Sequence, residues 1–154
     1  MKRRGGFTLV ELLIVIMIIA ILAGMMLLAT GSATDSAEAT KVINDLRGVK
    51  SAALMFYADY NAWPTGAQVN GGSLDEYMDR ATDSSRYGSL DVTEEDTQGR
   101  QYIGFDLRGP TATNGVKKKI AAKAQESGVY GSTGAAPGNT AFTAAHTKVW
   151  MNMR

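Results

Sequence analysis

The N-terminal part of the chain is an apolar run that carries no charge between Glu11 and Ala29. Residues 7–29, at about 1.5 Å of rise per residue, make a helix of about 35 Å, enough to cross the hydrocarbon core of a bilayer. The run leaves no polar face, whereas a helix on the surface of a soluble domain would show one. The pattern predicts a membrane-spanning helix over residues 7–30.

Further along, the apolar positions become periodic and are separated alternately by four and three residues. This spacing places them on one face of a helix, which is typical of a helix packed against a small domain. No proline lies between Phe7 and Trp63, and the residue before Pro64 is biased away from helix. Residues 31–63 are therefore predicted to continue the first helix. The stripe consists of Val42, Leu46, Val49, Ala53, Phe56 and Tyr60.

Residues 64–154 are predicted to form a globular α+β head. Residues 100–108 alternate in polarity and predict a half-buried strand, and residues 140–143 and 147–153 predict two more. A helix is predicted from Asn114 to Ser127, ending at Gly128, with its inward side formed by Val116, Ile120 and Ala124.

The rest of the head is predicted to be mostly loop. Composition favours loops at residues 66–72, 81–99 and 131–139. Between the first two, residues 73–76 have the spacing of a capping box and predict a short helix.

The charges flanking the apolar run predict its orientation. Lys2, Arg3 and Arg4 precede it, and positive residues stay cytoplasmic, so the C-terminal bulk is predicted to be exported. These three charges belong to a formal net charge of +1, which leaves −2 on the side chains that follow. This balance does not favour nucleic acid as a partner.

Glu11 is the unusual residue of the run. An acid at the centre of a span costs about 2.5 to 3.5 kcal/mol on insertion scales, and less near an end. By itself, Glu11 could reach water at the cytoplasmic side and be stabilised by the positive end of the helix dipole. Otherwise it requires a partner.

A basic leader that ends in Gly6, followed by Phe7, one acid at Glu11 and a long apolar helix, resembles the prepilin signal of the type IV pilin and pseudopilin family. The resemblance implies cleavage after Gly6 by a membrane peptidase that also N-methylates Phe7. It further implies that Glu11 meets the Phe7 ammonium of a neighbouring subunit in a filament, where low dielectric strengthens the attraction.

The family also implies a fold and partners. The expected fold is α+β, a pilin-like lollipop in which a long N-terminal helix packs its second half on a small C-terminal antiparallel sheet. Residues 1–6 would be a leader peptide. The expected partners are other copies of the chain, the prepilin peptidase and methyltransferase, and an inner-membrane assembly platform with its ATPase. The subunit would wait as a single-pass protein of the bacterial inner membrane, N-terminus cytoplasmic, before joining an extracellular or periplasmic filament.

Two departures from the family pattern refine this expectation. Many members carry a proline at the position of Leu28 and a glycine at that of Ala20, and both are absent here. The helix is therefore predicted to stay continuous where relatives unwind. Residues 56–65 resemble the helix exit of major pseudopilins, which makes a type II secretion pseudopilin the alternative within the family.

Other chemistry is sparse. The chain has no cysteine and a single histidine, His146, without a recognisable metal or catalytic motif around it, so no enzyme activity and no cofactor are predicted. Calcium is a minor candidate at a carboxylate cluster that lacks EF-hand spacing. Lysines 117, 118, 119 and 123 are interpreted as a solvated helix face. The carboxylate cluster consists of Asp91, Glu94, Glu95 and Asp96.

Three interpretations outside the filament class were weighed. A secretory signal cleaved between Leu28 and Ala33 is disfavoured, because the run is long for such a signal and contains Glu11. A membrane-anchored binding domain would use the helix only as a tether, so it predicts that Glu11→Leu is harmless. An exported hydrolase has no residue constellation to support it.

Overall fold

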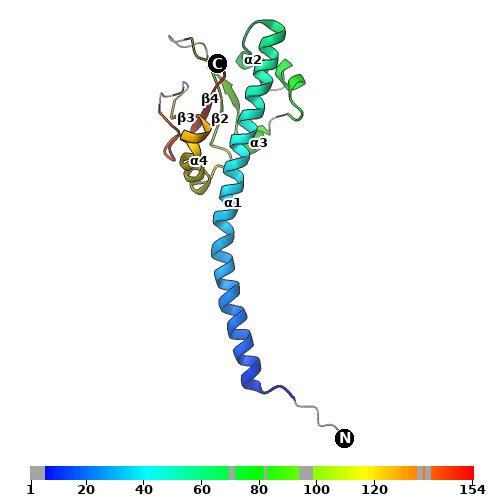
Figure 1. Cartoon of the computed structure of the whole chain (residues 1–154), viewed down its shortest axis with the longest axis vertical. Coiled ribbons are helices and arrows are strands. Elements are labelled where there is room, and N and C mark those ends of the chain that lie inside the picture. The colour runs from blue at the N-terminus through cyan, green and yellow to red at the C-terminus, as the bar shows by residue number, and fades with distance from the viewer. Residues whose placement is uncertain (1–5, 70–71, 82, 94–98, 135–136, 138–139) are drawn as a thin grey trace. The chain divides into compact units, whose positions relative to one another are not determined.

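The computed structural model describes residues 6–69, 72–81, 83–93, 99–134, 137 and 140–154. The chain divides into two compact units, residues 1–34 and 35–154. A single helix, α1 (Leu9–Tyr60), contributes its first part to one unit and its second part to the other (Figure 1). The helix is unbroken at Leu28 and at both of its early glycines, Gly24 and Gly31, as the absence of proline predicts.

The second unit is an antiparallel sheet with short helices. Its elements along the chain are α2 (Gly66–Val69), the 3₁₀ helix η1 (Ser73–Tyr77), α3 (Ser84–Tyr87), β1 (Leu90–Val92), β2 (Tyr102–Asp106), α4 (Asn114–Ser127), β3 (Val129–Ser132) and β4 (Lys148–Asn152). The strands lie in the order β1-β2-β4-β3, and every pairing is antiparallel. The expected α+β fold, with a long N-terminal helix and a small antiparallel sheet, is confirmed.

One apolar core joins the second part of α1 to the sheet. Five residues of the stripe predicted on α1 are at most 2% exposed: Val42, Leu46, Val49, Ala53 and Phe56. They share the core with inward residues of paired strands, such as Phe105, which lies opposite both Leu90 and Val149. Tyr60 differs from the sequence prediction, because it is 60% exposed. It lies on the last turn of α1, where its ring stacks on Phe56 at 4.6 Å between centroids.

Strand β2 is buried on both faces, whereas its alternating pattern predicted a half-buried strand. On the outer face, the indole of Trp150 lies over Gly104, and its Nε1 donates to Ser132 Oγ at 2.8 Å. Next to them, Asp106 is only 5% exposed and accepts hydrogen bonds from Arg108. The guanidinium holds the pKa of the Asp106 carboxyl below its usual value. A paired polar group therefore occupies a position that alternation assigned to solvent.

Several short elements escaped the sequence prediction. The segments predicted as loops contain α2, α3, β1 and half of β3. These elements have three to four residues each, too few to develop a periodic pattern. Residues 140–143, predicted as a strand, contribute only an isolated bridge between Ala141 and Tyr130. The helix at Asn114–Ser127 and the strand within residues 147–153 were predicted correctly.

Helix α4 is tied to α1 at its N-terminus. The Thr113 side chain caps α4 by accepting from Val116 N at 3.2 Å, and its hydroxyl donates to Asp35 Oδ1 on α1 at 3.1 Å. The second oxygen of Asp35 lies where a Cβ on Gly115 would be, 1.8 Å away. Glycine therefore leaves room for a carboxylate at the positive end of α4, where the helix dipole favours it.

Gly115→Ala is expected to lower the free energy of unfolding by about 1 kcal/mol, because the new methyl group displaces the Asp35 carboxylate. In an Asp35→Ala background the same substitution is expected to be neutral or stabilising, since alanine is the better helix former. Denaturant unfolding of the detergent-solubilised chain measures both. A loss of equal size in the two backgrounds would show that the carboxylate does not determine the choice of glycine.

Candidate functional site

The start of α1 is closed by a reciprocal set of hydrogen bonds between Thr8 and Glu11. Thr8 Oγ1 accepts from Glu11 N at 3.2 Å, while Glu11 Oε2 accepts from Thr8 N at 2.8 Å and from Thr8 Oγ1 at 2.7 Å. This is a capping box, with Thr8 as the N-cap and Glu11 three positions into the helix. The acid is satisfied within its own chain, and as a carboxylate it retains acceptor capacity for a further donor.

The capping role of Thr8 was not predicted from the sequence, although its signal is plain. Thr8 and Glu11 have the Thr-x-x-Glu spacing that precedes an apolar run. The same spacing at Ser73 and Glu76 predicted a short helix opened by a capping box. The helix is present as η1, but the predicted cap was wrong. The N-cap of η1 is Gly72, which makes no side-chain cap, and this glycine lies so close to Gln68 that a Cβ would be 2.7 Å from the Gln68 backbone.

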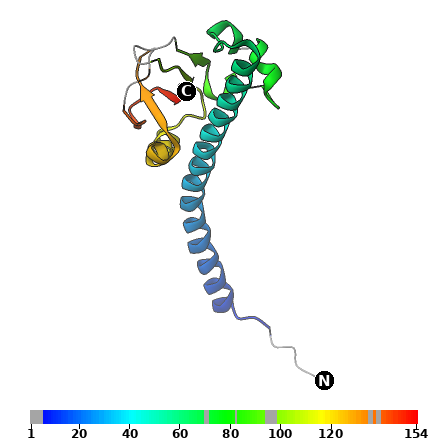
Figure 2. The same ribbon diagram turned by 45° about the horizontal axis from the view of Figure 1, so that its top comes forward.

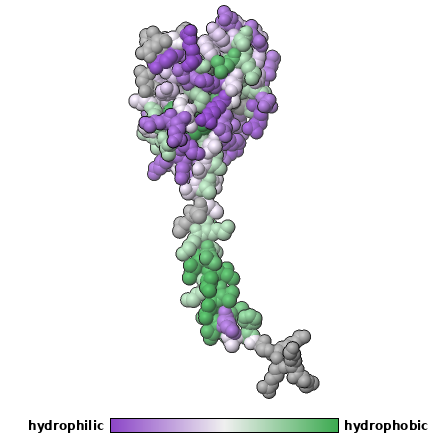
Figure 3. Space-filling model, in the orientation of Figure 1, coloured by the Kyte–Doolittle hydropathy of each residue, from purple (hydrophilic) through white to green (hydrophobic). Residues whose placement is uncertain are grey.

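Beyond the cap, the first part of α1 exposes apolar side chains on all sides. Every large apolar residue described between Leu9 and Leu27 is at least 47% exposed, and Phe7 is 86% exposed. Figure 3 shows this apolar surface along the helix. The most apolar part of α1 is not buried by the described chain at all, unlike the core helix of a soluble domain. By length and composition the helix can cross a membrane.

Gly6 and Phe7 precede the helix and lie outside its hydrogen-bonded ladder. Both residues are exposed, and nothing lies within 4 Å of the Cβ that Gly6 would carry. The basic residues of the leader, Lys2, Arg3 and Arg4, fall outside the described residues. The Gly6–Phe7 bond is thus sterically open in an irregular segment next to a capped, apolar helix.

The calcium candidates do not form a site among the described residues. Asp91 on β1 pairs with the ammonium of Lys148 on β4. Glu94, Glu95 and Asp96 lie outside the described residues. Within the part of the chain that the structure describes, no group of three His, Asp or Glu side chains is arranged to hold a metal ion.

His146 has a structural role between the last two strands. Its Nδ1 accepts from Thr143 N at 2.9 Å, which closes the turn before β4. The ring occupies the space beside Gly131 on β3, where a Cβ would be 2.1 Å from Nδ1. The absence of a side chain at Gly131 therefore makes room for the histidine. Because the composition of residues 131–139 is typical of a loop, the sequence did not predict that Gly131 belongs to a strand.

Comparison with known proteins places this geometry in a family. Residues 1–27 match the model of the prokaryotic N-terminal methylation motif. Over 117 residues the chain is 31% identical to the type II secretion system core protein G of Pseudomonas aeruginosa, an alignment that covers 71% of this chain and 80% of that protein. The chain belongs to the type IV pilin and type II secretion pseudopilin family. It is a pilin or pseudopilin subunit, as the prepilin signal led us to expect.

Other pilin-family relatives match shorter parts of the chain. The fimbrial protein of Neisseria meningitidis serogroup A is 42% identical over 60 residues, which cover 39% of this chain and 35% of that protein. The chain spans about half the length of two further core G proteins, 49% and 54%.

The fold is also shared with a pilin of known structure. The major type IV pilin PilA1 from Clostridium difficile superposes with a TM-score of 0.54 at 20% identity, over 79% of this chain and 98% of that one. At this identity the likeness concerns the fold. It agrees with the architecture described above, a long N-terminal helix with an antiparallel sheet.

Proposed function

We propose that the chain is a structural subunit of a pilus-like filament, held in the bacterial inner membrane by α1 until it is assembled. The observation that carries the proposal is the apolar surface between Leu9 and Leu27, exposed on all sides and bearing one carboxylate, Glu11, at its capped start. A surface of this kind requires a cover. Lipid provides one before assembly, and the helices of other copies provide one afterwards.

A polar contact at Glu11 would favour the transfer of α1 from lipid into the filament. Lipid tails are as apolar as leucine, so moving α1 from lipid into a bundle of helices gains little hydrophobic free energy. Packing and polar contacts must then drive association. We propose that Glu11 accepts a hydrogen bond from the Phe7 ammonium of a neighbouring subunit, a charge-assisted contact strengthened by the dry surroundings.

This contact requires processing, because only cleavage after Gly6 creates an amine on Phe7. We propose that a prepilin peptidase makes this cut and N-methylates Phe7, and that an ATPase on an inner-membrane platform drives assembly. The open Gly6–Phe7 bond, outside the helix ladder, supports access by a peptidase. Methylation keeps the positive charge of the amine, so the contact with Glu11 survives it.

Mass spectrometry of the mature protein tests the processing step. The expected N-terminus is Phe7 carrying one methyl group, and Gly6→Leu is expected to leave the leader attached, because a large side chain replaces the open position. A mature chain that begins between Leu28 and Ala33 would instead identify a secretory signal and exclude the filament proposal.

A secretion pseudopilin is the second candidate, favoured by the alignment that covers 80% of the Pseudomonas aeruginosa core protein G. The subunit, its processing and its helix contacts would be the same in both cases. Deletion of the gene separates them. Loss of long surface fibres identifies a pilus, and an export defect without any fibres identifies a pseudopilus.

A further inference from the structure

The lysines of α4 form a basic face that the proposed function leaves unused. Helix α4 contains four lysines and one glutamate, a net charge of +3. Lys118 is exposed, and Lys117 and Lys119 are half-exposed. Lys123 reaches back to α1, where its Nζ donates to Thr40 Oγ1 at 2.8 Å. The lysine face is defined here as Lys118 and Lys119, the two lysines that helix geometry turns furthest from the core residues Val116, Ile120 and Ala124.

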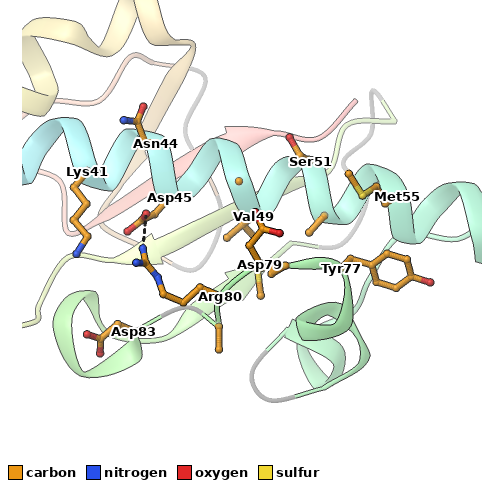
Figure 4. Close-up of a pocket in the computed structure, with 14 residues that line it drawn as sticks. Lys41, Asn44, Asp45, Val49, Ser51, Met55, Tyr77, Asp79, Arg80 and Asp83 are labelled. Carbon is orange, nitrogen blue, oxygen red and sulfur yellow. Dashed lines mark ion pairs between the residues drawn. The ribbon is translucent and has the colours of Figure 1, made fainter.

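A groove of complementary character lies between α1 and the segment that follows η1. It has a volume of about 460 Å³. Its lining combines an apolar part, which includes Val49, Met55 and Met78, with the carboxylates of Asp79 and Asp83. Figure 4 shows Asp45, Val49 and Met55 on the helix and Asp79 and Arg80 on the facing segment. The groove thus presents apolar and acidic surface side by side.

The lining of the groove carries three carboxylates, on Asp45, Asp79 and Asp83, and two cations, Lys41 and Arg80, a net charge of −1. Asp75 and Glu76 do not line it and bring the net charge of residues 73–83 to −3. Arg80 forms an ion pair with Asp45, with 3.9 Å between nitrogen and oxygen, but the arginine side chain is 76% exposed. A pair this long and this exposed contributes little, so Arg80 can be displaced at small cost.

The lysine face and the groove lie on opposite sides of the second unit. In Figures 1 and 2, α4 lies on one side of α1 and the segment that contains η1 and α3 lies on the other. One molecule therefore cannot bring its own lysine face into its own groove. A second copy can. A contact between two different surfaces of identical chains continues from copy to copy, and it builds an open filament when the rotation between copies does not close a ring.

We propose that the lysine face of one subunit docks in the groove of the next. This inference rests on the proposed filament function and names the contact between neighbouring heads. Lysine suits the groove because its aliphatic stem packs on apolar side chains such as Met55 and Met78 while its ammonium reaches carboxylates such as Asp79. Opposite net charges also orient the two surfaces before they touch.

Charge reversal tests the contact in cells that assemble the filament. Lys118→Glu with Lys119→Glu is expected to reduce assembled subunit about tenfold, because like charges then face each other. Asp79→Lys with Asp83→Lys is expected to do the same, because both carboxylates line the groove. All four changes in one chain exchange the two signs and are expected to restore assembly to within about twofold. Charge-conserving variants, Lys118→Arg with Lys119→Arg, are the matched control and should assemble normally.

Disulfide trapping tests the geometry, and the chain suits it because it has no native cysteine. A chain with both Lys118→Cys and Asp79→Cys is expected to give a ladder of cross-linked oligomers under oxidation. Two chains with one cysteine each are expected to give only dimers when mixed, and neither should cross-link alone. Dimers from a single-cysteine chain would show a symmetric contact and overturn the proposal.

The outcomes separate this inference from the proposed function. Filaments that form without cross-links, and that tolerate either charge reversal, would overturn the head contact and leave the filament subunit intact. A wild-type chain that is never assembled would overturn the proposed function itself. Retarded migration of duplex DNA by the wild-type protein, lost in Lys118→Glu with Lys119→Glu while assembly is unchanged, would assign the lysine face to nucleic acid instead.

Discussion

Glu11→Gln is expected to reduce filament assembly by about 10- to 100-fold while the protein still inserts in the membrane and is cleaved after Gly6. The factor follows from the loss of one hydrogen bond between charged groups, about 1.5–3 kcal/mol. Glutamine is the informative replacement, because it also fits a capping box and can keep the contacts to Thr8. The variant therefore removes the charge and preserves the cap. Quantitative immunoblotting of sheared filaments and of membranes measures the two pools.

Thr8→Ala is the matched control for Glu11→Gln. It removes the side-chain cap of α1 but leaves the carboxylate of Glu11, so a smaller reduction of assembly is expected. Glu11→Leu should assemble as poorly as Glu11→Gln, since both lack the negative charge. If Glu11→Leu assembles and functions normally, α1 is only a tether, and the membrane-anchored binding domain becomes the correct interpretation.

Gly104→Ala is expected to lower the free energy of unfolding by about 3 kcal/mol or more, a large part of the 5–15 kcal/mol of a typical domain. Gly104 lies at the centre of β2, opposite Trp150 on β4. A Cβ there would be 2.3 Å from Val149 O and 2.6 Å from Trp150 Cε3. Neither atom can move freely, because Val149 O is backbone of the neighbouring strand and the indole is anchored to Ser132.

Gly48→Ala is the matched control, with the same chemical change in an open place. Gly48 is exposed on α1, and nothing lies within 4 Å of its added Cβ. Alanine there is expected to stabilise by up to about 1 kcal/mol through its helix propensity. Denaturant unfolding of the full chain in detergent, followed by tryptophan fluorescence, compares the two variants. Equal midpoints for wild type and Gly104→Ala would show that β4 does not pack on Gly104 as described.

The limits of sequence-based prediction here have identifiable physical causes. Helix α4 could be predicted because its period, its inward residues and its αL cap at Gly128 all lie within one local stretch. The burial of β2 on both faces could not be predicted, because its outer face is covered by Trp150, which lies 46 positions after Gly104 in the chain. Tyr60 follows the period of the stripe and is still exposed, since periodicity does not indicate where the partner surface ends.

The two capping-box sequences also separate what local sequence decides from what tertiary contacts decide. Identical spacing at Thr8 and at Ser73 gives a closed cap in the first case and none in the second. At Thr8 the start of α1 is exposed, so the local hydrogen bonds between Thr8 and Glu11 determine the cap. At Ser73 the close approach of Gly72 to Gln68 fixes the entry into η1, and the side chain is not used.

By itself, the sequence predicted a prepilin junction at Gly6 and Phe7 and determined the unbroken α1 and the position of its acid, because these depend on composition, spacing and the absence of proline along one continuous stretch. Only the tertiary structure decided which glycines make room for a partner, as Gly115 does for Asp35, and which surfaces are left to face another copy. Such choices depend on atoms brought together from distant parts of the chain, and a local pattern does not record them.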